Sequence, residues 1–278
     1  MRAIFGWANE RYSDHWPGLF AIGFIVAIIP LTRIALEQGD PNALHPGVRI
    51  GLFLGYELVL LLGTAAMVLL ATSPEDARAS EAWRDVLRDW PRLILVKIAT
   101  ALVRWLPAIA AGALIRGIGP GAGIIVLLAA ALMLPFGFVS QMAFASAVIE
   151  RTGPFAAIER AFRRAIYGGL WTLWVAAFLF SLVESLPVVF VWVANIFFPP
   201  SMVPYTLPRV PGFGFPLPPM SLPGPFGSGI PWWMIMMLRL ATIPVLGYVA
   251  ALYAGAALEF AGADTSTREK PDVFASYT

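Results

Sequence analysis

Six long apolar stretches dominate the sequence, and each is long enough to cross a lipid bilayer. A helix needs about 20 mostly apolar residues to span the hydrocarbon region. Only 13% of the 278 residues are charged, against about 25% in an ordinary soluble domain. This composition excludes a soluble enzyme and a disordered chain, and the absence of cysteine excludes a disulfide-rich domain. We predict an all-α bundle of six transmembrane helices over residues 18–36, 50–71, 93–115, 123–149, 169–197 and 231–261.

The basic residues are divided unevenly between the two sides of this predicted bundle. Twelve Lys and Arg residues lie in segments 1–17, 72–92, 150–168 and 262–278, and four lie on the opposite side: Arg33 near the end of the first span, and Arg49, Arg116 and Arg209 in the connections. Because cytoplasmic loops carry an excess of Lys and Arg, we expect both termini in the cytoplasm. We further expect one transmembrane domain over residues 1–262 and a disordered tail over 263–278.

Two of the basic connections have the periodicity of amphipathic helices. Segments 80–90 and 155–167 each place their large apolar residues three or four positions apart. Such helices lie in the plane of the membrane surface. Two interpretations are open: the helices pack on the bundle and extend their arginines to water, or the arginines bind anionic lipid headgroups. The candidate headgroup ligands are Arg84, Arg88, Arg160, Arg163 and Arg164.

The sequence also contains an internal repeat in parallel orientation. Pro135 and Pro244 are each followed fifteen residues later by a glutamate, Glu150 and Glu259. The predicted unit is an interfacial helix, an outward helix and a proline-containing return helix that ends in Glu. Two parallel copies are related by a pseudo-rotation about the membrane normal. A diverged third copy over the first two spans remains open.

One segment of the repeat resembles a known bacterial pattern. The run VIERTGP (148–154) ends a hydrophobic helix in Glu, and an Arg-bearing amphipathic helix then leads into the next span. It is similar to the multi-helix membrane domain found beside glycerophosphoryl diester phosphodiesterases and to related six-helix bacterial proteins. The chain has no room for the phosphodiesterase barrel of roughly 250 residues. The resemblance therefore implies a bacterial inner-membrane protein involved with lipids, and it implies no catalysis.

Four charged residues fall deep within the predicted spans: Glu57, Arg104, Glu184 and Arg239. An unpaired charge at mid-membrane costs at least about 2.5–3.5 kcal/mol, so such residues are expected to pair. We predict that the two acids and two bases converge inside the bundle. They form either a structural clamp that fixes the helix order or a polar cavity for an ion, a proton or a lipid headgroup.

The sequence shows no nucleophile–base pair, phosphate loop or metal-ligand spacing, so we expect no enzyme activity, metal or cofactor. The net charge of +2 gives no reason to expect nucleic acid. We predict a non-catalytic membrane protein that binds lipids or acts as a scaffold, with the Pro- and Gly-rich loop 198–230 as a candidate contact for a protein partner. A transporter that uses the four deep charges is the alternative. A lipid enzyme near Glu150 and Glu259 is the third hypothesis.

Overall fold

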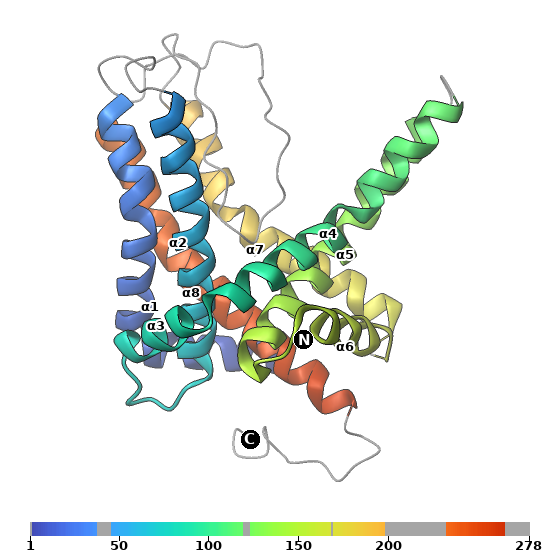
Figure 1. The fold of residues 1–278 in the computed structure, drawn as a ribbon, viewed down its shortest axis with the longest axis horizontal. Helices are drawn as coiled ribbons and strands as arrows, with labels where there is room; N and C mark the ends of the chain where they lie inside the picture. The colour runs from blue at the N-terminus through green and yellow to red at the C-terminus, as the bar shows by residue number, and fades with distance from the viewer. Residues whose placement is uncertain (1, 38–45, 119–122, 168, 198–231, 265–278) are drawn as a thin grey trace. The chain divides into compact units, whose positions relative to one another are not determined.

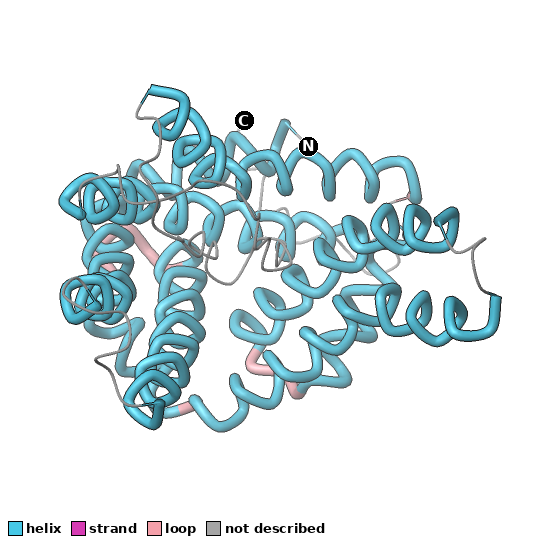
Figure 2. Tube along the Cα trace, turned by 90° about the horizontal axis from the view of Figure 1, so that it is seen from above, coloured by secondary structure: helices cyan, strands magenta, loops and turns pink. Residues whose placement is uncertain are grey.

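The structure, a computed structural model, describes residues 2–37, 46–118, 123–167, 169–197 and 232–264. All the described elements are helices (Figures 1 and 2). The predicted outer loop 198–230 and most of the predicted tail lie outside the described residues. The described helices are α1 (Arg2–Glu37), α2 (Pro46–Thr72), α3 (Ala79–Arg88), α4 (Trp90–Ile118), α5 (Gly123–Glu150), α6 (Pro154–Tyr167), α7 (Leu170–Phe197) and α8 (Trp232–Asp264).

Several of these helices have the length and composition of membrane spans. Within the described residues, α6 with Leu170–Leu186 forms one further candidate if this bent pair is taken as a single span. The predicted span 18–36 extends past the residues whose side chains the structure describes. The chain therefore has the helices of a membrane protein. The four continuous candidates are Ile50–Thr72, Trp90–Leu114, Ile124–Glu150 and Leu240–Glu259.

The first helix begins much earlier than predicted, at Arg2 instead of residue 18. Its N-terminal half carries charged residues, so hydropathy does not predict this half as part of an apolar span. A stripe at helical spacing is nevertheless buried along it and continues into the predicted span. Burial of one face of an amphipathic helix supplies most of its stability. The stripe consists of Ile4, Ala8, His15, Leu19 and Ile22, each at most 3% exposed.

The chain packs into two units. The first contains residues 1–8, 91–180 and 252–278, and the second contains residues 9–90 and 181–251. In the first unit α6 packs against α5, and in the second unit α3 packs against α2. Each unit therefore contains a long helix that is followed directly by a short amphipathic helix packed against it.

Glycines allow the helices of the second unit to approach closely. A Cβ atom at Gly63 of α2 would lie 2.2 Å from Val26 Cγ2 of α1, and a Cβ atom at Gly23 of α1 would lie 2.5 Å from Ile243 Cγ2 of α8. Small residues have this role at helix contacts in membranes, where backbones can come near one another. Helices α1 and α2 accordingly run side by side (Figure 1).

Aromatic rings form much of the core of the first unit. The ring centroid of Phe180 in α7 lies 5.0 Å from that of Phe138 in α5 and 4.9 Å from that of Tyr253 in α8. All three side chains are at most 2% exposed. These edge-to-face contacts are favourable beyond their buried area.

Large apolar side chains cover the outer surface of α4 and α5. Ile109 is 59% exposed and Leu127 is 72% exposed, and they are two of many such residues on these helices. Soluble monomers rarely expose contiguous apolar patches of this extent. Lipid hydrocarbon is the environment that such a surface requires.

Candidate functional site

The four charges predicted to converge are carried by four different helices. Glu184 in α7 is buried, with 6% exposure, whereas Glu57 in α2 and Arg104 in α4 are half-buried. Arg239 lies in α8, and its side chain is outside the described part of the structure. Arg104 belongs to the first unit and the other three residues to the second. Their convergence remains a prediction.

Glu150, the last residue of α5, is held by two arginines of α6. The Nη2 group of Arg164 donates to Oε1 at 2.7 Å, and Arg160 donates to Oε2. Arg164 is 6% exposed and also donates from Nη1 to Ser146 Oγ at 3.1 Å. Charge-assisted hydrogen bonds of this kind are the strong ones in proteins. We call these three residues, Glu150, Arg160 and Arg164, the glutamate clamp.

A second set of bonds holds the end of α5 from α4. Nη1 of Arg92 donates to the carbonyl oxygens of Ala147 at 2.8 Å and Thr152 at 2.6 Å. The second unit contains a similar bond, because Arg11 of α1 donates to the carbonyl oxygen of Ser73, just after α2, at 3.4 Å. The last carbonyls of a helix lack intrahelical donors and attract cations. An arginine therefore caps the C-terminal end of a long helix in both units.

The predicted headgroup arginines of α6 therefore have different surroundings. Arg164 is buried in the glutamate clamp and Arg160 also contacts Glu150, so both guanidinium groups bind a carboxylate of the protein itself. Arg163 is exposed and pairs with exposed Glu159 at 2.5 Å. The sequence leaves both interpretations open for all three because they share a polar face. The missed signal was Glu150, which precedes them across a short Gly-Pro turn.

The small residues of α6 pack inward. Ala157, Ala161 and Ala165, spaced four apart, are at most 1% exposed, and α6 packs against α5. Phe155 and Tyr167 belong to the predicted apolar stripe and are 84% and 70% exposed. A tyrosine such as Tyr167, with one apolar and one polar end, is typical of the membrane interface. The outward face of α6 therefore has the chemistry of an interfacial helix.

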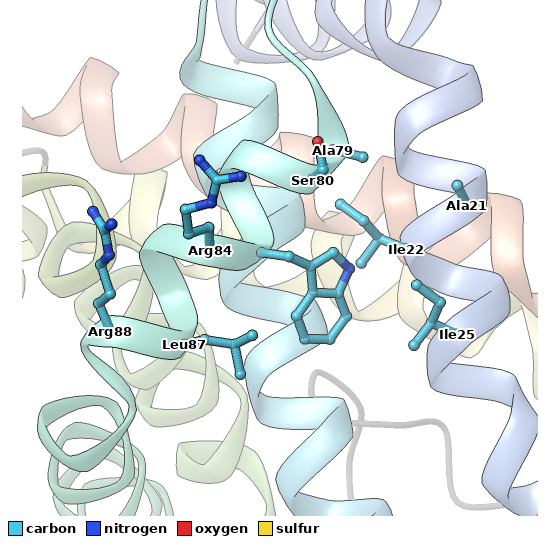
Figure 3. Close-up of a pocket in the computed structure, with 9 residues that line it drawn as sticks. Ala21, Ile22, Ile25, Ala79, Ser80, Arg84, Leu87 and Arg88 are labelled. Carbon is cyan, nitrogen blue, oxygen red and sulfur yellow. The ribbon is translucent and has the colours of Figure 1, made fainter.

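An open groove runs between α1 and α3 in the second unit. Its volume is about 610 Å³, within the range of about 300–1,000 Å³ typical of ligand clefts. Ala21, Ile22 and Ile25 form the α1 wall. Ile25 is 43% exposed, whereas Ile22 is fully buried. In Figure 3, Ile22 and Ile25 point from α1 toward α3.

The opposite wall of the groove is α3. Ala82 and Val86 anchor this helix because both are buried, while Leu87 is 54% exposed and lines the groove. Arg84 and Arg88 line it as well, are exposed, and extend their guanidinium groups to the same side of α3 (Figure 3). The remaining lining residues are Ala79, Ser80 and Trp83. The lining of the α1–α3 groove is thus almost wholly apolar, and the guanidinium groups of Arg84 and Arg88 lie at its edge.

No protein-family model matches the sequence, and comparisons with curated proteins and with solved structures also give no match.

Proposed function

We propose that the protein is a multi-pass membrane protein that binds anionic phospholipids in the α1–α3 groove without catalysing a reaction. The observation that carries this proposal is the pairing of exposed Arg84 and Arg88 with apolar Ile25 and Leu87 in one groove. A phospholipid combines the same two chemistries, a charged phosphate and hydrocarbon chains. Arginine matches phosphate geometry through several donors, and basic residues near the surface of an anionic membrane attract its headgroups.

The proposal includes six spans with both termini in the cytoplasm of a bacterium. The excess of basic residues on one side supports this orientation. The resemblance of segment 148–154 to lipid-associated bacterial membrane domains supports the link to lipids. The arginine caps at Ser73 and Thr152 support a repeat in which α1–α2 corresponds to α4–α5, because Arg11 and Arg92 occupy similar places.

The orientation can be tested directly because the chain has no cysteine. Single cysteines at Glu75 and Ser201 provide labelling sites on opposite predicted sides of the membrane. A membrane-impermeant maleimide applied to intact spheroplasts should label Ser201→Cys and leave Glu75→Cys unlabelled until the membrane is opened. The reverse pattern would overturn the cytoplasmic placement of the termini.

Lipid binding is tested by titrating the detergent-solubilised protein with phosphatidylglycerol or phosphatidylcholine and counting bound lipid by native mass spectrometry. A basic residue near an anionic surface contributes about 1 kcal/mol. The variant Arg84→Gln/Arg88→Gln should therefore bind phosphatidylglycerol about thirtyfold more weakly. The matched control is Arg2→Gln/Arg151→Gln, which removes two exposed arginines that neither line the groove nor belong to the candidate headgroup ligands. Equal affinities of the two variants would refute the site.

Transport remains the second candidate function because Glu184 is buried, at 6% exposure, in α7. A buried carboxylate within a membrane helix is a typical feature of ion and proton pathways. Proteoliposomes loaded with a pH-sensitive dye and placed under a potassium diffusion potential provide the test. A proton flux that is present in the wild type and lost in Glu184→Gln would favour transport over lipid binding alone.

A further inference from the structure

The α1–α3 groove contains a polar group that the proposed function does not yet use. Trp83 is half-buried and lines the groove from α3. Its indole Nε1–H is buried and has no hydrogen-bond partner among the described residues. Buried polar groups are nearly always paired, and each exception calls for an explanation. Indole is a donor only, so the missing partner must be an acceptor.

The surroundings of Trp83 restrict the acceptor. Its neighbours along the groove include aliphatic Ile22, Ile25 and Leu87, while the cations Arg84 and Arg88 follow it on α3. An acceptor at this position therefore lies between a charged end and a hydrocarbon end. In a glycerophospholipid, the acyl-ester carbonyls occupy this place, between the phosphate and the chains.

We propose, resting on the lipid-binding function above, that the groove recognises an ester-linked anionic glycerophospholipid and that the Trp83 Nε1–H donates to an acyl-ester carbonyl. The phosphate lies at Arg84 and Arg88, and one acyl chain lies along Ile25 and Leu87. Because Nε1 is covered in the free protein, this contact requires the indole to turn toward the groove. Aromatic rings with a polar N–H suit this depth, where one end is wet and the other apolar.

The ligand pair that tests this inference differs in the ester carbonyls. Dipalmitoyl phosphatidylglycerol has two ester carbonyls, whereas di-O-hexadecyl phosphatidylglycerol has ether oxygens in their place. A single neutral hydrogen bond corresponds to about a fivefold difference in affinity. Native mass spectrometry of the full-length wild type should therefore show about fivefold tighter binding of the ester lipid. This comparison needs no variant, so a folding defect cannot obscure it.

Two conservative variants then locate the donor. Trp83→Phe keeps an aromatic ring and removes the N–H, so it should bind the ester and ether lipids equally. Trp90→Phe is the control, because Trp90 is 46% exposed and does not line the groove; it should keep the fivefold ratio. A wild-type ratio of one, or a ratio that survives in Trp83→Phe, would overturn the inference.

The outcome also separates this inference from the function on which it rests. Loss of affinity in Arg84→Gln/Arg88→Gln together with equal binding of ester and ether lipids would remove only the Trp83 contact. No loss of phosphatidylglycerol affinity in that arginine variant would remove the binding site itself.

Discussion

Replacing Glu150 by Gln is the sharpest test of the packing between α5 and α6. The substitution keeps the shape of the side chain and removes the charge that Arg164 and Arg160 contact. A hydrogen bond to a charged group contributes about 1.5–3 kcal/mol, and the uncharged amide oxygen of the new side chain is a weaker acceptor for the buried Arg164, which also donates to Ser146. The bond from Arg160, whose side chain is 44% exposed, adds at most about 1 kcal/mol.

Solvent screening reduces the summed contribution of these two bonds to stability, because the Glu150 side chain is itself 25% exposed. We therefore expect Glu150→Gln to lower the free energy of unfolding by about 2 kcal/mol, less than the 3–5 kcal/mol typical of breaking a fully buried pair. The measurement is unfolding of the purified protein in mixed micelles, followed by circular dichroism as the fraction of denaturing detergent rises.

A control and a double-mutant cycle make the result specific. The pair between Arg163 and Glu159 lies on the same helix but is exposed, at 52% and 67%, so Arg163→Gln should change stability by less than about 0.5 kcal/mol. Arg164→Gln combined with Glu150→Gln should cost less than the sum of the single changes, by about 1 kcal/mol or more. Equal losses of unfolding free energy for Glu150→Gln and Arg163→Gln, or strict additivity in the cycle, would refute the stabilising role of the glutamate clamp.

Three further predictions concern packing and charge in the spans. Gly63→Ala should lower stability by about 1–3 kcal/mol, because the new methyl group would meet the side chain of Val26 in α1 at 2.2 Å. Gly51→Ala in the same helix has open space and should raise stability by about 0.5–1 kcal/mol. Thermal denaturation in micelles compares the two variants. If the deep charges form a structural clamp, Glu184→Gln and Arg104→Gln should each lower the melting temperature, and two unchanged values would contradict the clamp. Arg92→Gln removes two hydrogen bonds to backbone carbonyls at the end of α5 and should cost about 1.5–3 kcal/mol; proteolysis at that end no faster than in the wild type would argue against this capping role.

Much of the helical layout is predictable from local sequence. A bilayer leaves the backbone no hydrogen-bond partners except its own, so long apolar runs become helices. The amphipathic segments 80–90 and 155–167 correspond to α3 (Ala79–Arg88) and α6 (Pro154–Tyr167). The end of α6 is also local in origin: Gly169 has φ +85°, a left-handed conformation that favours glycine.

Other features depend on neighbours that are distant in the sequence. The start of α1 at Arg2 could not be located from hydropathy, because its polar face hides the stripe that packing buries. The packed face of α6 also depends on such a neighbour. Its periodicity is compatible with an aromatic or an alanine face toward the protein, and close contact with α5 selected Ala157, Ala161 and Ala165.

The sequence alone determined that this chain is helical, apolar and suited to a membrane, because composition and periodicity act over a few turns of helix. Tertiary structure decided what each arginine does. Arg164 and Arg84 occupy similar amphipathic helices, yet Arg164 is buried on Glu150 whereas Arg84 is exposed at the α1–α3 groove. The strength of an ion pair depends on distance and on solvent screening, and both are set only when the helices pack.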